Sequence, residues 1–415
     1  MTDEKTCWYQ DSCCDEMNAF YDKEIKGKAP YPHIEVFKSL IGLIDDEKGK
    51  NLLDIGCGTA MISEYCTNFL YFGTDLAHVI IKCAMRNYPD YFYRKCDIIA
   101  DPMTWIDTYR VIVMNGFIDI MQEPVSILEK VLANAQKYVI IHRQEITETG
   151  ITKVIQNGSY GGYTYHSIIN RDEFNTLLDE YNFSVVKELP CGFSNWENDG
   201  SSFLLKKRKS WALNLIDHKL NKYFIGRENG FFIDAGANDG ITQSNTMFFE
   251  FYKNWTGILI EPIPELVDKC LENRSPRSYT ASCALVSPDY PEKHIFMIYT
   301  PDCNGLLSVI DNPTGQDLLK RDQHGRKVNI KVNAYTLDNV LNILCKSSQK
   351  IDLLSMDIEG HEIQALKGLS LDKWNIDYIL VEELEENDNV FNILSPYYDR
   401  VERITPQDIL YKRKS

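Results

Sequence analysis

Two stretches of the chain end an apolar run in an acid that is followed by closely spaced glycines: NLLDIGCGT at residues 51–59 and GFFIDAGANDG at residues 230–240. A parallel strand that turns into a nucleotide-binding loop has this pattern, because glycines let the backbone approach a ligand closely. A further acid ends the next apolar run, Asp75 after Asp54 and Glu261 after Asp234. An acid at that distance suits the hydroxyls of a ribose. The two patterns predict two nucleotide-type sites in one polypeptide.

The first loop lacks part of the pattern of a dinucleotide-binding dehydrogenase. Gly56 and Gly58 supply two of its glycines, but Met61 occupies the position of the third. The chain also has no GKS or GKT run, which excludes a phosphate-binding P-loop. The segment LLDIGCGTA instead resembles motif I of S-adenosylmethionine-dependent methyltransferases.

That resemblance implies a set of cofactor contacts in the first half of the chain. The implied contacts are Asp54, Gly56 and Gly58 for the methionine moiety, Asp75 for the ribose, Asp97 for the adenine amino group and Asn115 beside the methyl group. The interpretation of Asp97 stays open, because an acid that only caps its own loop has the same position.

Two histidines are candidates for catalysis in the first half. His142 ends the fifth expected strand, and His166 lies in the segment YTYHS, which is expected to be a loop before the next helix. Either place could face an acceptor, where an imidazole can take up a proton. The alternative for both is a structural histidine that is held by hydrogen bonds.

The second half resembles one family closely. The segments FFIDAGANDGITQSNT, GILIEPIPE, TLDNVL, IDLLSMDIEGHEIQALKG and IDYILVEE are similar, in order and spacing, to the FkbM family of S-adenosylmethionine-dependent O-methyltransferases. The resemblance covers about residues 210–415, and IDLLSMDIEGHEIQALKG is its most specific part. That family largely methylates hydroxyls on sugars and on polyketide-type natural products.

The family resemblance implies the cofactor contacts of the second site. They are Asp234, Gly236, Asn238 and Gly240 in the methionine-binding loop, Ser244 and Asn245 near the carboxylate, Glu261 at the ribose, Ala284 in the adenine pocket and Asp357 next to the methyl group. The long segment 301–325, with NGLLS at 304–308, falls where the family places residues that contact the acceptor.

Methyl transfer to an alcohol needs an in-line oxygen and removal of its proton as the new bond forms. Asp357 is the expected base, with Glu359 or His361 as alternates, and Glu382 ends the fifth strand nearby. Carboxylates can act directly or by holding a divalent cation, which the motif allows but does not require. The alternative for Glu359 is a cap on the helix that begins near Glu362, and for His361 a surface position.

The elements around both loops predict an α/β fold. Strands and helices alternate in each half, which is typical of a doubly wound, mostly parallel sheet. We expect two tandem Rossmann-like methyltransferase domains, 1–208 with an N-terminal helical extension and 209–415, each with a seven-stranded sheet, an antiparallel last strand and helices on both faces. Helices are also expected at 14–26, 60–68 and 210–224.

The composition narrows the classes of partner. The chain has 415 residues, 44% of them hydrophobic, and a formal net charge of −16, which argues against general affinity for nucleic acid. The twelve cysteines show no zinc-site spacing, and no segment has the length of a signal peptide or membrane span. We expect a cytoplasmic protein without a nucleic-acid partner that acts on a small-molecule or glycan hydroxyl.

Three functional hypotheses remain at this stage. The first is a bifunctional methyltransferase in which the C-terminal domain methylates a hydroxyl oxygen and the N-terminal domain acts on another acceptor. The second is a single active C-terminal domain whose N-terminal partner binds the acceptor. The third is a non-catalytic binding module, which degraded glycine loops would favour. The sequence does not indicate the oligomeric state.

Overall fold

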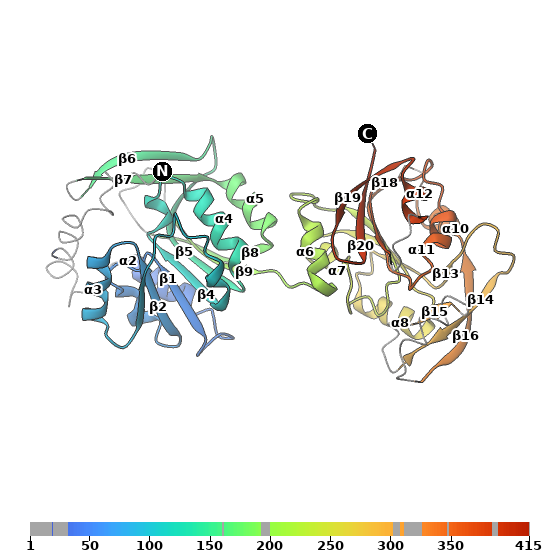
Figure 1. Ribbon diagram of the computed structural model, residues 1–415, viewed down its shortest axis with the longest axis horizontal. Coiled ribbons are helices and arrows are strands. Elements are labelled where there is room, and N and C mark those ends of the chain that lie inside the picture. The colour runs from blue at the N-terminus through green and yellow to red at the C-terminus, as the bar shows by residue number, and fades with distance from the viewer. Residues whose placement is uncertain are drawn as a thin grey trace. The chain divides into compact units, whose positions relative to one another are not determined.

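A computed structural model describes residues 32–159, 162–191, 200–301, 308–310, 326–346, 348–383 and 389–414, together with Ala19. The chain divides into two compact units, Met1–Arg208 and Lys209–Ser415 (Figure 1). The expected helix at 14–26 and most of the expected acceptor segment 301–325 lie outside the described residues.

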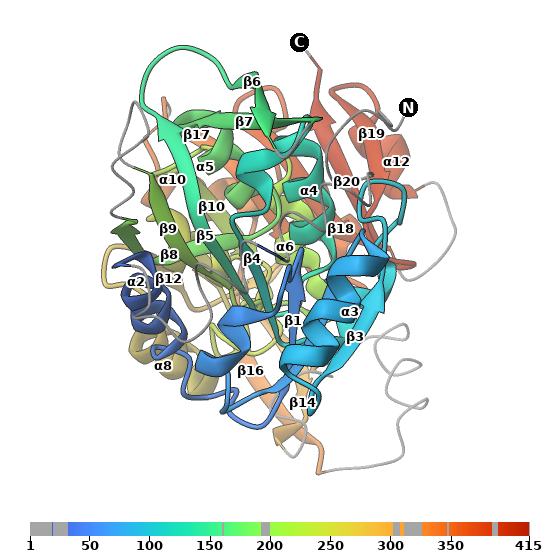
Figure 2. The same ribbon diagram turned by 90° about the vertical axis from the view of Figure 1, so that its left-hand side faces the viewer.

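The first unit is built on one mixed sheet. Its strands are β1 (Asn51–Ile55), β2 (Leu70–Asp75), β3 (Phe92–Lys95), β4 (Val111–Asn115), β5 (Tyr138–Thr147), β6 (Lys153–Ser159), β7 (Gly162–Asn170), β8 (Phe183–Pro190) and β9 (Ser201–Lys207). Strands β3, β2, β1, β4 and β5 lie side by side and parallel, and the antiparallel pair of β9 and β8 continues the sheet from β5. Figure 2 shows β1, β4 and β5 in this unit.

Both faces of this sheet are covered, because the central strands carry apolar side chains on both sides. The helices are α2 (Pro32–Ile41), α3 (His78–Asn87), α4 (Pro124–Asn134) and α5 (Arg171–Glu180), with 3-10 turns at Met61–Tyr65 (η3), Thr104–Thr108 (η4) and Ile118–Ile120 (η5). Leu53 and Ile112 pack with α4 and α5 on one face, and Leu52 and Val111 pack with α2 on the other.

The sheet of the first unit differs from the expected seven strands. Strand β5 is ten residues long. Its last residues leave β9 and pair instead with β7, with Glu145 opposite Ile168. The segment that was expected to be a loop around His166 is therefore the second strand of a β6–β7 hairpin. Its alternating β-branched and aromatic residues, GYTYHSIIN, favour a strand. The expected helix at 60–68 is only the short turn η3.

The main sheet of the second unit has the expected seven strands. They are β10 (Phe231–Ala235), β11 (Thr256–Ile260), β12 (Tyr279–Ala281), β17 (Lys350–Met356), β18 (Asn375–Glu382), β19 (Tyr398–Arg403) and β20 (Asp408–Arg413). Their order is β12-β11-β10-β17-β18-β20-β19, and β20 is antiparallel to both of its neighbours. The predicted fold class, two tandem Rossmann-like α/β units, is confirmed.

The second unit also contains a four-stranded sheet that the sequence did not indicate. It has the order β13 (Ala284–Leu285), β16 (Val328–Tyr335), β14 (His294–Tyr299), β15 (Val309–Ile310). The helices are α6 (Ile216–Asn221), α7 (Met247–Lys253), α8 (Pro264–Asn273), α10 (Leu337–Leu344), α11 (Glu362–Lys367) and α12 (Asn389–Leu394). The expected helix at 210–224 is interrupted, because Asn214 and Leu215 adopt left-handed backbone angles.

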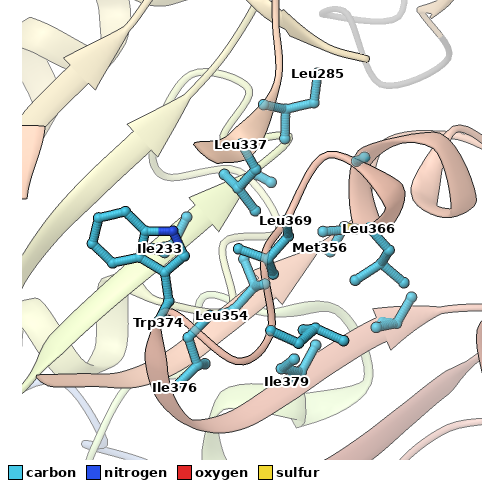
Figure 3. Close-up of a cluster of buried hydrophobic side chains, with 14 of the residues drawn as sticks. Ile233, Leu285, Leu337, Leu354, Met356, Leu366, Leu369, Trp374, Ile376 and Ile379 are labelled. Atoms are coloured by element: carbon cyan, nitrogen blue, oxygen red, sulfur yellow. The ribbon is translucent and has the colours of Figure 1, made fainter. Parts of the chain in front are cut away.

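The core of the second unit fixes the strands that carry the second glycine loop. Ile233 on β10, Leu354 on β17 and Ile379 on β18 are fully buried beside Trp374 (Figure 3). Each of these apolar side chains contributes roughly 1.5–3 kcal/mol on burial. Strands β10, β17 and β18 therefore present their carboxyl ends at a rigid edge.

Candidate active sites

The second glycine loop begins at Asp234, a buried acid near the carboxyl end of β10. Its Oδ2 accepts hydrogen bonds from the hydroxyls of Thr246 (2.5 Å) and Ser244 (3.3 Å). Burial raises the pKa of Asp234, while the charge of Arg274 and the hydroxyl donors oppose that rise. Asp234 thus ties the loop to the start of α7.

Gly236 is the point at which the loop touches the neighbouring strand. Its φ is +88°, and a Cβ at this position would lie 1.7 Å from the carbonyl oxygen of Asp357. A backbone atom cannot move aside as a flexible side chain can, so only glycine fits here. Gly240 also has a left-handed backbone, with φ +82°. The cofactor loop and the expected base are therefore in direct backbone contact.

Glu261 follows β11 and closes the other side of the loop. Its carboxylate accepts the backbone N–H groups of Asn238 and Ile263, each at 2.9 Å. Burial raises its pKa to about 7, although these two N–H donors favour the ionised form. This position, beside the glycine loop and at the carboxyl end of the next strand, is the one expected of a ribose acid.

Ser244 and Asn245 are buried at the entrance to α7. The Ser244 hydroxyl accepts the backbone N–H of Met247 at 3.1 Å, as a capping residue does. The Asn245 amide donates to the Ser355 hydroxyl at 3.1 Å. Among the described residues, its Oδ1 has no hydrogen-bond partner. A buried carbonyl oxygen without a partner is a suitable acceptor for a ligand donor.

Sequence reasoning missed Arg274, which follows α8. Its side chain is 1% exposed and donates to the Gly240 carbonyl (3.0 Å), the Thr246 hydroxyl (3.0 Å) and the Glu250 carboxylate (3.1 Å). It also lies 3.6 Å from the carboxylate of Asp234. Its only signal in the sequence is a cation after an amphipathic helix, which is a common surface feature.

Carboxyl groups gather where β17, β18 and β20 meet. Asp357 follows β17, Glu382 ends β18, and the two side chains share a hydrogen bond. Asp408 on β20 lies opposite Glu382 on β18 in the antiparallel register. Desolvation is the main cause that raises the pKa of both members of the pair, and repulsion from neighbouring carboxylates adds to it. Two carboxyls that share a hydrogen bond must hold one proton between them.

The segment after Asp357 adds further acids. Glu359 has a left-handed backbone, and burial with the charges of Asp357 and Glu362 raises its pKa to about 8. Glu362 accepts the N–H groups of Ile358 (3.0 Å) and Gly360 (3.2 Å). Capping of this turn is therefore done by Glu362, a role that the sequence had offered to Glu359.

Two other expected residues of the second site have different surroundings. His361 is half-buried at the start of α11, and burial lowers its pKa to about 4, so it is neutral at physiological pH. Ala284 is buried on β13, at the edge of the four-stranded sheet, and Leu285 beside it packs in the core with Ile260.

The first glycine loop has a similar arrangement around Asp54. Asp54 is fully buried, and its Oδ2 accepts the hydroxyl of Tyr71 at 2.5 Å. Its Oδ1 has no hydrogen-bond partner within the described part of the chain. Burial raises the pKa of Asp54 to about 7. Asp75 accepts the backbone N–H of Gly58 at 3.0 Å, as Glu261 accepts that of Asn238 in the second loop.

The remaining residues of the first loop also lie at the carboxyl edge of the sheet. Gly56 has φ +68°, and a Cβ here would lie 2.1 Å from the ring of Phe117. Gly58 has φ +53° with open space around it. Asp97 accepts the N–H groups of Ile99 and Ala100, which is the loop-capping geometry that the sequence left open.

Asn115 ends β4 and is paired in register with His142, which lies in the middle of β5 and not at its end as expected. The Oδ1 of Asn115 and the Nε2 of His142 both lack hydrogen-bond partners among the residues that the structure describes. His142 is 1% exposed, and its Nδ1 lies 2.9 Å from the Ser202 hydroxyl. Its ring lies against His33 and Phe37 of α2, and burial lowers its pKa to about 2. His142 is therefore a neutral core residue.

The β6–β7 hairpin brings His166 to the same edge. Its Nε2 lies 2.8 Å from the carboxylate of Glu145, which is fully buried on β5. The Ser167 hydroxyl donates to the Ile118 carbonyl at 2.8 Å, which ties β7 to the turn that follows Asn115. A half-exposed imidazole against a buried carboxylate has the geometry of a general base and its orienting group.

The described residues contain neither a metal-binding cluster nor a membrane-spanning helix. These residues contain no group of three or more His, Cys, Asp or Glu side chains placed to hold a metal ion. No helix among them is long and apolar enough to cross a membrane.

Comparisons with solved structures find weak overall likenesses. A magnesium protoporphyrin IX methyltransferase from Synechocystis, determined with bound S-adenosylmethionine, is 10% identical, with a TM-score of 0.34, and the match covers 47% of this chain and 97% of that one. An amino pentose methyltransferase from Micromonospora echinaspora is 14% identical with a TM-score of 0.34, covering 45% and 96%. A methyltransferase from Clostridium acetobutylicum is 12% identical with a TM-score of 0.35, covering 48% and 100%.

Comparison with protein families gives a specific match, whereas no curated protein matches the chain. Residues 234–404 match the model of the methyltransferase FkbM domain. The matched range begins at Asp234 and includes Glu261, Asp357 and Glu382, so it covers the second glycine loop and the Asp357–Glu382 pair. The C-terminal unit of this chain therefore contains an FkbM methyltransferase domain.

Proposed function

We propose that the C-terminal unit transfers a methyl group from S-adenosylmethionine to a hydroxyl oxygen of a sugar or glycan. The observation that carries this proposal is the backbone contact between Gly236 and Asp357, which brings the residue that bears the expected base next to the second glycine loop. A hydroxyl acceptor needs a base beside the cofactor loop to remove its proton. A neutral amine already has a lone pair that can attack the methyl group.

The residues of the second loop fit this cofactor. Asn245 offers an unpartnered buried carbonyl oxygen for an ammonium group, and Glu261 lies where a ribose diol needs an acceptor. The left-handed angles of Gly236 and Gly240 let the loop turn tightly against the Asp357 backbone and the Arg274 side chain. When bound, the cofactor supplies an electrophilic methyl group on a sulfonium ion.

Asp357 acts in this mechanism as the proton acceptor. It is exposed at the edge of the sheet, so an acceptor hydroxyl can approach it. In the ligand-free protein, Glu382 holds the proton of the pair and donates its hydrogen bond, so Asp357 is the ionised member. Asp357 takes up the hydroxyl proton as the new carbon–oxygen bond forms. Glu359, whose pKa lies near 8, is mostly protonated at neutral pH and is a weaker candidate.

Incubation with labelled S-adenosylmethionine and a panel of free and nucleotide-linked sugars tests the proposal. We expect methyl gain on a sugar hydroxyl, detected by mass analysis, and loss of turnover by about 100-fold or more in Asp357→Asn. Methyl gain on amines alone, or unchanged turnover in Asp357→Asn, would contradict the assignment. Asp372→Asn, at an acid away from the carboxyl cluster, is the matched control.

We further propose that the N-terminal unit is a second methyltransferase with its own acceptor. The specific support is the pair of unpartnered acceptors at its glycine edge, Asp54 Oδ1 and Asn115 Oδ1. His166, oriented by Glu145, is the proposed base of this site, since His142 is enclosed in the core.

The number of cofactor sites separates this proposal from a chain with one active unit. We expect calorimetric titration with S-adenosylhomocysteine to give two sites per chain, with one lost in Asp54→Ala and the other in Asp234→Ala. A stoichiometry of one that only Asp234→Ala removes would leave the N-terminal unit without a cofactor role. Circular dichroism of both variants checks that each remains folded.

A further inference from the structure

The carboxyl pair of the second site, Asp357 and Glu382, has a geometry that supports a second role besides that of a base. Glu382 ends β18 and Asp357 follows β17, and these parallel strands are in register with Met356 opposite Val381. The two side chains are therefore neighbours at one edge and share a hydrogen bond. Glu382 Oε2 is buried and has no other hydrogen-bond partner within the described residues.

The surroundings of this pair are strongly acidic. The groups that face it from adjoining elements are Asp234 from β10, Asp408 from β20, and Glu359 and Glu362 from the segment after β17. Two of these acids have a cation beside them, Asp234 with Arg274 and Asp408 with Lys219. His361 is neutral above about pH 4 and adds no charge at physiological pH. The proton of the pair therefore offsets part of this negative charge.

We propose that Glu382 makes the site selective for the charged form of the cofactor by giving up the shared proton when a sulfonium binds. This inference rests on the proposed function of the C-terminal unit. S-adenosylmethionine carries a positive sulfonium, and S-adenosylhomocysteine, its product, carries a neutral thioether. A cation beside the pair replaces the proton, whereas a neutral sulfur does not.

The pair of Asp357 and Glu382 then loses and regains one proton in each reaction cycle. On cofactor binding the proton of Glu382 leaves to solvent, and Asp357 and Glu382 are both ionised. As the sulfur–methyl bond breaks and the oxygen–methyl bond forms, the pair takes up the hydroxyl proton. The product complex then holds a neutral thioether and a pair with one proton, as in the free protein. The pair thus becomes a stronger base only while the methyl donor is present.

Calorimetric titration of the full chain measures this proton directly. At pH 7.5, S-adenosylmethionine and S-adenosylhomocysteine are titrated in two buffers of different ionisation enthalpy. We expect S-adenosylmethionine to release up to one proton more than S-adenosylhomocysteine. The ratio of their affinities then rises with pH, by up to about tenfold per pH unit near neutrality.

The matched variants are Glu382→Gln and Glu383→Gln. Glutamine at 382 keeps the shape and a hydrogen-bond donor but cannot release a proton. Glu383 is the next residue, and its carboxylate is occupied by the Tyr411 hydroxyl at 2.6 Å and lies 3.8 Å from Arg400. We expect Glu382→Gln to lose the extra proton and the pH-dependent affinity ratio, and Glu383→Gln to keep both. The N-terminal unit is the same in the wild type and in both variants, so it contributes equally to the proton release of all three proteins.

Three outcomes would count against the inference. Equal proton release with both ligands in the wild-type protein overturns it, as does an unchanged difference in Glu382→Gln. Either result leaves the proposed methyl transfer intact. If Asp234→Ala removes no binding, the proposed function of the C-terminal unit is overturned, and the inference with it. Equal melting temperatures of Glu382→Gln and wild type show that the comparison is made on folded protein.

Discussion

Single residues decide how closely the two glycine loops approach their neighbours. Gly236 faces a backbone carbonyl, while Gly56 faces the movable ring of Phe117. The same residue type thus meets a rigid obstacle in one loop and a flexible one in the other. We expect the second loop to tolerate substitution less than the first.

Gly236→Ala should abolish cofactor binding by the C-terminal unit. The new methyl group would meet the Asp357 carbonyl at 1.7 Å, and the φ of +88° adds strain of about 1–3 kcal/mol. Gly226→Ala is the matched control, because its φ is +67° but no atom lies within 4 Å of the added Cβ. Calorimetry with S-adenosylhomocysteine checks this. Equal binding by both variants would show that the loop moves freely from β17.

Asp54 makes the stability of the N-terminal unit depend on pH. Its folded pKa is raised to about 7 from an ordinary value of 3.8, so the unfolded chain loses its proton first as pH rises. The free energy of unfolding should therefore fall between about pH 4 and pH 7, by about 2–4 kcal/mol. Asp54→Asn should remove that part of the dependence.

Urea unfolding at pH 5 and pH 8 measures the effect. Asp45→Asn is the control, since Asp45 is exposed and pairs with Lys48 on the surface. A wild-type pH dependence that persists unchanged in Asp54→Asn would assign it to another group.

At the scale of elements, strand ends and the segments that follow them build both sites. Strand β10 ends in Asp234 and Ala235, and β17 leads into Asp357. Arg274, which follows α8, holds the second glycine loop through three hydrogen bonds to loop atoms. It also forms an ion pair with Glu250 of α7. Arg274 therefore helps to fix the conformation of the second glycine loop.

Arg274→Met should destabilise the C-terminal unit by about 3–5 kcal/mol, because it leaves the buried carboxylates of Asp234 and Glu250 without their cation. Arg277→Met, an exposed position three residues later that donates to Asn254, should change stability little. The measurement is the free energy of unfolding from urea titration. A small loss in Arg274→Met would mean that water or the hydroxyls of Ser244 and Thr246 suffice.

The sequence predicted the elements whose chemistry is local. A run such as FFIDAG contains both the strand and the loop, so Asp234 and Gly236 were identified by spacing alone. The hairpin β6–β7 and the four-stranded sheet were missed, because their pairing joins segments that carry no motif. Arg274, Glu145 and the proton shared by Glu382 were missed for the same reason. Their roles arise from contacts between residues far apart in the chain.

At the scale of the whole molecule, the chain consists of two units that each complete their own sheet. No strand of one sheet pairs with a described strand of the other. The contacts described for the second site all arise within residues 209–415. The separate organisation of the units predicts that each can be studied alone.

A fragment of residues 209–415 should fold and bind S-adenosylhomocysteine with an affinity within about threefold of the full chain. The second glycine loop, Glu261 and the carboxyl pair are all internal to the fragment. Calorimetry on the fragment and on the full chain makes the comparison. A fragment that is folded but binds at least ten times more weakly would show that the first unit contributes to the second site.

The strand order has a consequence for synthesis on the ribosome. In the first unit, β1 pairs with β4, so Asp54 lies opposite Val113. In the second unit, the central pair joins Ile233 to Leu354, more than a hundred residues later. Contacts between distant segments form late, because the intervening chain must first emerge. The first sheet can thus assemble early during translation, whereas the second glycine loop meets its neighbours only after β17 and β18 have emerged.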